Sequence, residues 1–362
     1  MCGPGGRFSG ARQCPRHLVD VELAIPKLRH GSFFPGLLEP RRRIDRALWA
    51  VIMEAFVHGV STRTVDDLVA ALGIDAGVSK SQVSRICTEL DAAVAEFRER
   101  RLDHICFPYV FLDATYVKAH EGARVVSKAV IVATGVAADG NREVLGLAVG
   151  DSEDKSFWTA FLRSLRTRGL GGVRLVISDA HEGLRQSIER VMLGAGWQRC
   201  RVHFLRNVLA KVPKGSAEMV AAAIRTIFAQ PDATAVTDQL ETMAAKLGRQ
   251  FPAVEAMLRD AALDICAFAT FPQAHWKKIW STNPLERVNK EIKRRTNVVG
   301  IFPNEAGVLR LAGSVLLEVH DEWQVSDRRY LSDGSMAKLY ETDNDEDTRK
   351  EVGNKTKELL AG

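Results

Sequence analysis

The chain has 362 residues, of which 46% are hydrophobic and 26% charged, so it can bury a core and is long enough for two or three domains. The net charge of +5 and the sequence pI of about 8.9 make it mildly basic. Its six cysteines are scattered, which argues against a disulfide framework. No apolar run approaches the roughly 18 residues that span a membrane, and the N-terminus has no apolar signal-peptide region, so we expect a cytoplasmic protein without a membrane partner.

The basic residues are clustered rather than evenly spread. One cluster lies near residue 41 and a second near residue 290, and such clusters form the electrostatic footprint of a protein that binds a polyanion such as DNA. A solvated helix face is the alternative for either cluster taken alone. The clusters are Arg41, Arg42, Arg43 and Arg46, and then Lys290, Lys293, Arg294 and Arg295.

The first part of the chain divides into an irregular leader and a helical region. Residues 1–40 carry glycines and prolines without a period, apart from one candidate strand at 19–26. Apolar residues at helical spacing then predict three helices, at 44–57, 61–72 and 79–90.

The second and third of these helices are joined by a turn that contains Gly73. Two short helices joined in this way favour a helix-turn-helix DNA-binding domain over residues 41–104. Its second helix would present polar side chains to the major groove, namely Lys80, Gln82 and Arg85. A plain helical hairpin inside a bundle is the alternative.

After residue 105 the pattern changes to strands. Aromatic and β-branched runs predict strands at 109–118, 125–134 and 143–149, joined by turns at 121–124 and 138–141. A three-stranded antiparallel meander therefore opens this domain. Helices and strands then alternate, with helices at 157–165, 182–193 and 204–212 and short strands at 173–178 and 198–202.

This order of elements is that of a ribonuclease H-like α/β fold. Residues 215–280 contain no convincing strand and predict an all-helical insertion, after which a helix covers 284–295. The expected domains are the leader (1–40), the DNA-binding domain (41–104), the catalytic domain (105–214 and 281–335), the insertion (215–280) and a flexible tail (336–362).

Two aspartates are candidates for chemistry. Asp113 lies inside the first strand, where a carboxylate is costly unless it is paired or binds a cation. Asp179 directly follows the fourth strand, although it could also cap the next helix. The first and fourth strands are neighbours in a ribonuclease H-like sheet, so the two carboxylates should converge and require a divalent cation between them.

Glu286 is the best third acid for a two-metal site. Pro284 can open the helix that carries it, so Glu286 lies in the first turn, beside a basic helix able to hold the DNA backbone. A glutamate that only complements the helix dipole is the alternative. Glu291 competes for the role but lies five positions on and faces elsewhere.

Cys200 and His203 form a Cys-x-x-His pair. A structural zinc needs four ligands, and Cys14 with His17 is the only other pair at this spacing, so a shared zinc is a minor alternative. We expect the pair to support the active site or to contact DNA, against the simpler alternative of a buried cysteine beside a hydrogen-bonded histidine.

Four separated motifs, in this order, resemble the bacterial Mutator-type insertion-sequence transposases. The resemblance covers about residues 19–330. The motifs are Phe111-Leu112-Asp113-Ala114-Thr115-Tyr116, Ser178 to Leu184, Trp197 to Phe204, and Ser281 to Arg295.

This resemblance implies a DDE transposase with a catalytic triad of Asp113, Asp179 and Glu286, separated by 66 and 107 residues, and with Cys200 and His203 as the family's Cys-x-x-His pair. The implied reaction is DNA cleavage at terminal inverted repeats, followed by attack of the freed 3′-hydroxyl on target DNA. It implies Mg²⁺ or Mn²⁺, as two ions, and no nucleotide cofactor. We expect a homodimer or higher oligomer in a bacterial, nucleoid-associated setting.

One departure from the family is the short leader before Val19, where family members carry further DNA-binding helices. A truncated chain, a wrong start and a decayed copy remain open as explanations, and we expect retained chemistry. Two other functions are alternatives to an active transposase. One is a truncated or domesticated, non-catalytic DNA-binding protein that competes for transposon ends. The other is a nuclease for RNA–DNA hybrids, which would need neither the insertion nor the helix-turn-helix.

Overall fold

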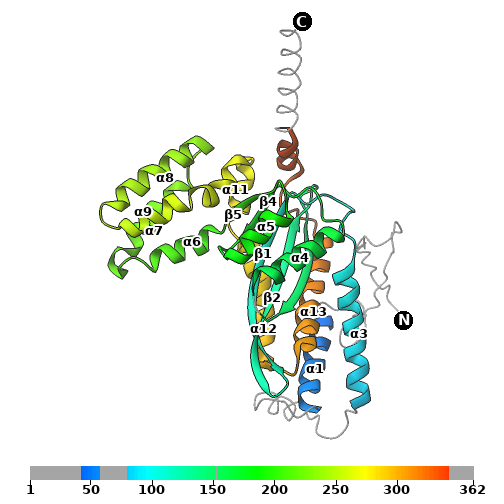
Figure 1. Cartoon of the computed structure of the whole chain (residues 1–362). Helices are drawn as coiled ribbons and strands as arrows, with labels where there is room; N and C mark the ends of the chain where they lie inside the picture. The colour runs from blue at the N-terminus through cyan, green and yellow to red at the C-terminus, as the bar shows by residue number, and fades with distance from the viewer. Residues whose placement is uncertain (1–41, 58–79, 152, 342–362) are drawn as a thin grey trace, which may run out of the picture.

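The protein folds around one mixed β-sheet with helices on both faces, which makes it an α/β protein (Figure 1). The computed structural model describes residues 42–57, 80–151 and 153–341. The strand expected at 19–26, the helix expected at 61–72 and most of the expected tail lie outside these ranges. Within them, no helix is both long and apolar enough to cross a membrane.

The sheet has the strand order β3-β2-β1-β4-β5, with β6 paired to β1 beyond this path. The first three strands form the expected antiparallel meander, and β4 and β5 continue the sheet in parallel with β1. The central strand β1 is thus hydrogen-bonded to β4, as predicted. The strands are β1 (Tyr109–Glu121), β2 (Arg124–Val136), β3 (Arg142–Gly150), β4 (Leu175–Ser178), β5 (Gly196–Arg199) and β6 (Ile301–Phe302).

Alternate residues of β1 enter two different cores because side chains along a strand point to opposite faces. Val110 and Leu112 pack in the core on one face, and Tyr109 and Phe111 pack in the core on the other. Asp113 continues the second series, so its side chain belongs to the face covered by the later helices. All four apolar side chains are at most 1% exposed.

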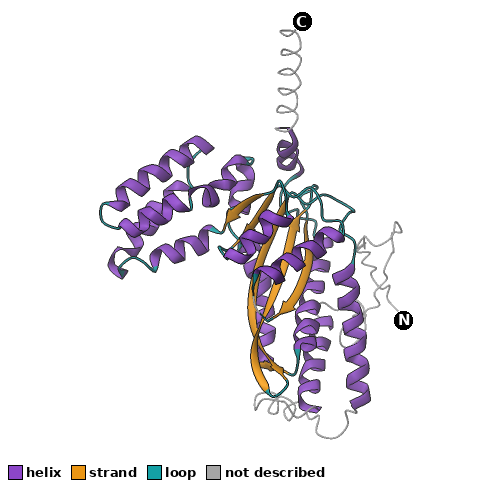
Figure 2. Ribbon diagram, in the orientation of Figure 1, coloured by secondary structure: helices purple, strands orange, loops and turns teal. Residues whose placement is uncertain are grey.

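The helices divide between these two faces (Figures 1 and 2). On the first face lie α4 (Lys155–Thr167) and α5 (Glu182–Val191), whose buried side chains include Trp158 and Leu184. Gly169, with a φ of 99°, follows α4 and takes the chain back toward β4. On the second face lie α1 (Arg42–Val57), α3 (Lys80–Glu99), α12 (Asn283–Val299) and α13 (Glu305–Gln324).

A buried arginine ties the N-terminal helices to α13. The guanidinium of Arg310 donates to Glu54 of α1 at 2.6 Å and to both carboxylate oxygens of Asp91 of α3 at 2.8 Å. Only 3% of the Arg310 side chain is exposed, so these charge-assisted bonds satisfy a guanidinium that would otherwise be buried without a partner.

Between β5 and α12 the chain forms a helical lobe that projects to one side of the sheet (Figure 1). The buried side chain of Gln198 joins the lobe to β5, because its amide donates to the carbonyl of Ile265 at 3.0 Å and accepts from the backbone N–H of Phe268 at 2.7 Å. The α-helices between β5 and α12 are α6 (Arg201–Leu209), α7 (Ala217–Ile227), α8 (Ala233–Gly248), α9 (Pro252–Asp260), α10 (Ala262–Cys266) and α11 (Gln273–Ile279).

Two local predictions were wrong in their bounds, and one strand was not predicted. The strand expected at 198–202 is β5, which ends at Arg199, and Val202 belongs to α6 because Cys200 already caps that helix. The helix expected to end at Leu90 runs on to Glu99, since Val94 and Phe97 continue its buried stripe. The two-residue strand β6 is too short to leave a periodic signal.

Candidate active site

Asp113 lies in the middle of β1 with a largely buried side chain. Its Oδ1 atom accepts the backbone N–H of Ala114 at 2.9 Å, and its Oδ2 atom accepts the Nδ2 amide of Asn289 at 2.8 Å. Burial raises the pKa of Asp113 to about 6, and the nearby negative charge of Asp179 acts in the same direction. Asp113 forms no ion pair with a lysine or arginine of the described ranges, so its charge is incompletely compensated.

Asp179 follows β4 and lies beside Asp113. The register pairs Phe111 of β1 with Ile177 of β4, an offset of 66 residues, and the same offset joins Asp113 to Asp179. The alternative role of Asp179 as a helix cap does not hold, because His181 is the N-cap of α5 and its ring accepts the N–H of Leu184. The Asp179 side chain is 45% exposed and faces an accessible edge of the sheet.

The buried side chain of Asn289 connects α12 to β1. Its amide donates to Asp113, while its Oδ1 atom is buried without a hydrogen-bond partner in the described ranges. A buried, unpaired carbonyl oxygen is unfavourable on its own and fits a site that receives a further polar group. Asn289 therefore both fixes the position of Asp113 and leaves one acceptor open beside it.

Glu286 lies in the first turn of α12, three residues before Asn289. Pro284 opens the helix as expected, and Glu286 is exposed and makes no hydrogen bond or ion pair with any described residue. Residues three apart on a helix lie on the same side, so Glu286 projects one turn from the Asn289–Asp113 contact.

The competing carboxylate, Glu291, is already occupied. It accepts from Arg294 at 2.7 and 2.9 Å and from Arg295 at 3.2 Å. The hydrogen bonds from Arg294 are the main reason that the pKa of Glu291 falls to about 2. A carboxylate compensated by two guanidinium groups is a poor candidate for a metal ligand, which favours Glu286.

Cys200 joins the starts of α6 and α12. It is fully buried, and its sulfur accepts the backbone N–H and the hydroxyl of Thr282, both at 3.4 Å. Burial raises the pKa of the Cys200 thiol, but the contacts with His203 and Thr282 outweigh this and lower it overall. In the described ranges, Cys200 forms no disulfide.

His203 faces the aspartates from the first turn of α6. Its Nδ1 atom lies 3.9 Å from Oδ2 of Asp179, which is too far for a hydrogen bond, and has no hydrogen-bond partner in the part of the chain described. The adjacent Cys200 sulfur, helped by the charges of Asp179 and Asp113, raises the pKa of His203 to about 9. The pair thus places a positive charge beside two carboxylates.

Sequence reasoning missed Arg199, the last residue of β5. Its guanidinium lies over the ring of Phe204 at 4.9 Å, and burial lowers its pKa while the charges of Asp179 and Asp264 raise it. The register pairs Arg199 with Ser178, the residue before Asp179. Arg199 could have been found in the sequence because it lies in a predicted short strand, and functional residues of α/β sheets gather at the ends of such strands.

The oxygen atoms at this end of the strands provide some, but not all, of the ligands that a hard divalent cation needs. Among the described residues, the two converging carboxylates form no ion pair with a lysine or arginine, and the buried amide oxygen beside them has no hydrogen-bond partner. Mg²⁺ takes few carboxylates and retains several waters, so two aspartates suffice to begin such a site. Within the described ranges, however, no three Asp, Glu, His or Cys side chains already stand together as a metal site, so Glu286 remains apart from the aspartates.

The residues expected to contact DNA have different surroundings. Lys290 and Lys293 of α12 and Arg85 of α3 are exposed and form no ion pair with a described residue. Arg294 and Arg295 are held by Glu291, and Arg295 also donates to Asp45 at 3.2 Å. The side chains of Lys80 and Gln82 lie outside the described part, as does the first helix of the expected helix-turn-helix.

The fold and the site define an α/β protein with two neighbouring aspartates, one inside β1 and one directly after the adjacent strand β4, and a basic helix beside them. The family model described as "Transposase, Mutator family" matches residues 9–326. The chain is 46% identical over 345 residues to the transposase of the insertion sequence element IS1081 from Mycobacterium tuberculosis, covering 91% of this chain and 82% of that protein.

Two further similar proteins are also transposases of insertion sequences. The transposase of IS256 in transposon Tn4001 from Staphylococcus aureus is 37% identical over 314 residues, covering 86% of this chain and 80% of the relative. The transposase of IS406 from Burkholderia multivorans is 39% identical over 306 residues, with coverage of 84% and 78%. The chain therefore belongs to the Mutator family of transposases.

Proposed function

We propose that this protein is a DDE transposase that cleaves DNA at the terminal inverted repeats of its element and joins the freed ends to target DNA, using Asp113, Asp179 and Glu286. The observation that carries the proposal is the convergence of Asp113 and Asp179 on neighbouring strands, with Asn289 holding the helix of Glu286 against Asp113. The sheet order, in which an antiparallel meander is extended by two parallel strands, supports a ribonuclease H-like fold.

The reaction consists of two phosphoryl transfers. In the first, a water oxygen forms a bond to phosphorus while the bond from phosphorus to the 3′-oxygen breaks, which leaves a 3′-hydroxyl and a 5′-phosphate. In the second, this 3′-hydroxyl attacks a target phosphodiester and displaces the target's own 3′-oxygen. The number of phosphodiester bonds is unchanged in the second step, so no nucleotide cofactor is needed.

Asp113 and Asp179 would hold Mg²⁺ or Mn²⁺, and Glu286 would complete the site once DNA binds. The ions would activate the attacking oxygen and stabilise the leaving 3′-oxygen. Asn289 fixes the orientation of the Asp113 carboxylate through its 2.8 Å hydrogen bond. Lys290 and Lys293 lie on the same helix, form no ion pair with a described residue, and would bind the DNA phosphates. Two element ends imply that two copies of the chain act together.

A non-catalytic DNA-binding protein is the second candidate. One observation favours it, which is that Glu286 does not form a ready metal cluster with the aspartates in the described ranges. A binding protein has no need, however, of a buried carboxylate such as Asp113, whose pKa stays raised despite the nearby charge of His203, because such a group destabilises the fold unless it binds a cation.

A cleavage and joining assay tests the proposal. The substrates are duplexes that carry the ends flanking the gene, with Mg²⁺ or Mn²⁺ and a plasmid target, and the variants are Asp113→Asn, Asp179→Asn and Glu286→Gln. The proposal predicts nicking and joining by the unmodified chain and loss of both, by at least about 100-fold, in each variant, with DNA binding retained. Binding without cleavage by the unmodified chain would support the second candidate instead.

A further inference from the structure

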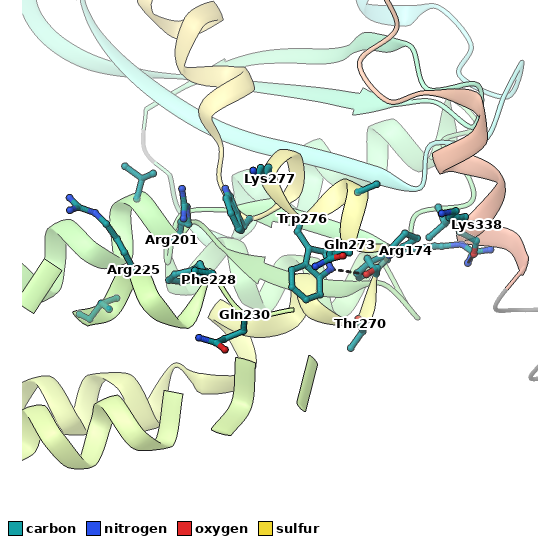
Figure 3. Close-up of a pocket in the computed structure, with 18 of the residues that line it drawn as sticks. Arg174, Arg201, Arg225, Phe228, Gln230, Thr270, Gln273, Trp276, Lys277 and Lys338 are labelled. Atoms are coloured by element: carbon teal, nitrogen blue, oxygen red, sulfur yellow. Dashed lines mark hydrogen bonds between the residues drawn. The ribbon is translucent and has the colours of Figure 1, made fainter. Parts of the chain in front are cut away.

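A long, positively charged groove lies next to the active site, between the helical lobe and residues 333–341 (Figure 3). Its volume is about 1570 Å³, which exceeds the roughly 300–1,000 Å³ of pockets that enclose one small molecule. Figure 3 shows Arg201 and Arg225 at one end of the groove and Arg174 and Lys338 at the other. The basic residues of its lining are Arg174, Arg201, Arg225, Lys277 and Lys338, against one acid, Glu341.

Arg201 is a half-buried cation in the lining of the groove. Its guanidinium lies over the ring of Trp280 at 3.8 Å and over that of Phe228 at 5.3 Å, and it forms no ion pair with a described carboxylate. Burial lowers the pKa of Arg201, and the positive charge of Arg225 lowers it further. Two neighbouring cations, one of them half-buried and without a counter-ion, are stabilised by a bound anion.

Two segments that line the groove continue into the active site. Arg201 lines the groove and directly follows Cys200, which contacts the active-site histidine. Trp280 lines the groove and lies two positions before Thr282, which donates to Cys200. The backbone N–H of Arg201 donates to the carbonyl of Trp280 at 3.0 Å, so the two segments are joined. The groove therefore adjoins the segments that position Cys200 and His203.

The wall between the two basic ends contains one accessible aromatic ring. Phe228, Trp276 and Trp280 are buried, at 5% to 9% exposure, whereas Phe271 is half-buried and offers part of its ring. An accessible aromatic ring beside basic side chains is typical of sites for single-stranded nucleic acid, where phosphates contact the cations and an unpaired base contacts the ring. Duplex DNA keeps its bases stacked inside the helix and would not present one to Phe271.

We propose that the groove binds an unpaired stretch of DNA that continues from the cleaved bond, with its phosphates on Arg201, Arg225 and Lys277. This inference rests on the proposed transposase function, and it names the form of the DNA that the site receives. It predicts that strand separation next to the cleavage site strengthens binding of the flanking DNA, independently of base sequence.

Fluorescence anisotropy of the full chain, in EDTA so that no cleavage occurs, tests this inference. The probes are a blunt duplex that carries the element end and the same duplex with a 12-nucleotide single-stranded extension beyond the cleavage position. The extension should tighten binding by about tenfold or more, because its phosphates contact the cations of the groove and an unpaired base can contact Phe271. The triple variant Arg201→Gln, Arg225→Gln, Lys277→Gln should lose this gain and bind the blunt duplex within about twofold of the unmodified chain.

A matched triple variant controls for net charge. Arg163, Lys214 and Lys246 are exposed, form no ion pair with a described residue and lie outside the groove, so their replacement by Gln should leave the gain intact. Because Arg201 packs on Trp280, a second variant changes only the exposed Arg225 and Lys277 and should lose a large part of the gain without loss of thermal stability. Equal weakening of both probes by the groove and control variants, or an unchanged gain in both groove variants, would overturn the inference.

The assay also separates this inference from the proposed function. Asp113→Asn, which should not cleave DNA, should retain the full preference for the extended probe. If the unmodified chain prefers the extension but never cleaves, the groove assignment stands and the catalytic proposal fails. If it cleaves but shows no preference for the extension, the groove assignment fails alone.

Discussion

Asn289 and Asp113 are 176 positions apart in the chain and are joined by a hydrogen bond of 2.8 Å between the Asn289 amide and the Asp113 carboxylate. This bond crosses from α12 to β1 and connects the helix of the third candidate acid to the strand of the first. The bond therefore fixes the position of α12, and with it the position of Glu286, relative to the two aspartates.

Asn289→Ala should reduce cleavage by about tenfold or more while leaving DNA binding within about twofold, because Asp113 loses its fixed orientation. The measurement is the single-turnover cleavage rate at saturating DNA. Asn297 lies on the same helix and is exposed, so Asn297→Ala serves as the control and should cleave normally. Equal rates in both variants would mean that the Asn289–Asp113 bond has no part in positioning the acids.

Asp113→Asn should keep the fold and raise the thermal stability of the metal-free chain. The substitution removes a desolvated charge whose pKa is raised to about 6, an effect of up to about 3 kcal/mol, while the side-chain oxygen of the new residue can still accept from Asn289. Melting curves with and without Mn²⁺ measure this. The unmodified chain should be stabilised by Mn²⁺ and the variant should not. A strongly destabilised variant would show that the Asp113 carboxylate is structural.

Cys200→Ala and Cys200→Ser should differ. Serine retains an acceptor for the two donors of Thr282, whereas alanine leaves them buried and unpaired, at a cost of about 1–3 kcal/mol. Denaturant unfolding should therefore rank the alanine variant as the less stable one. If serine proved as damaging as alanine, the contribution of Cys200 would come from its packing and not from these hydrogen bonds.

Removal of the Cys200 sulfur should also lower the pKa of His203 from about 9 toward its usual value near 6.5, because the sulfur is the main cause of the increase. A histidine with a raised pKa stabilises the fold below its unfolded-state value, and this contribution disappears as the pH rises through 9. The stability of the unmodified chain should therefore fall between pH 6.5 and 9, and more steeply than that of Cys200→Ala. NMR titration of the histidine ring gives the pKa, and an unchanged value in the variant would contradict the assignment.

Glu286→Gln and Glu291→Gln should have opposite effects. The side chain of Glu286 forms no hydrogen bond or ion pair with a described residue, so its substitution should abolish cleavage without changing stability. Glu291 has its pKa lowered to about 2, so its contribution is present above about pH 4.5 and is lost as the pH falls toward 2.

Glu291→Gln should consequently cleave DNA normally and lose about 1 kcal/mol or less at neutral pH, with a weaker dependence on acid. Stability measured at pH 3, 5 and 7 beside the cleavage rate separates the two carboxylates. Loss of cleavage in Glu291→Gln, with activity retained in Glu286→Gln, would show that Glu291 and not Glu286 is the third catalytic acid.

The sheet and the pair of aspartates could be predicted because they depend on local patterns. The alternation in β1 and the apolar run of β4 are visible in the sequence, and neighbouring parallel strands then place Asp113 next to Asp179. The bond from Asn289 to Asp113 and the contact of Thr282 with Cys200 could not be predicted, since both join segments more than 80 positions apart.

The groove could not be predicted from the sequence either. Its cations come from α6, α7, α11, the residue before β4 and residues 333–341, and none of these segments carries more than two consecutive basic residues. Only the packing of α6 against α7 brings Arg201 beside Arg225. By contrast, the obvious basic run at Arg294 and Arg295 is largely occupied by Glu291 and Asp45, which a sequence pattern does not reveal.

The most direct test of the catalytic assignment is the anomalous scattering of Mn²⁺ in crystals of the chain bound to a DNA end. The account predicts Mn²⁺ bound by the carboxylates of Asp113 and Asp179 beside the phosphate to be cleaved, with the Glu286 carboxylate completing the site. Mn²⁺ bound elsewhere, or a DNA complex in which Glu286 stays away from both aspartates and the ion, would contradict it.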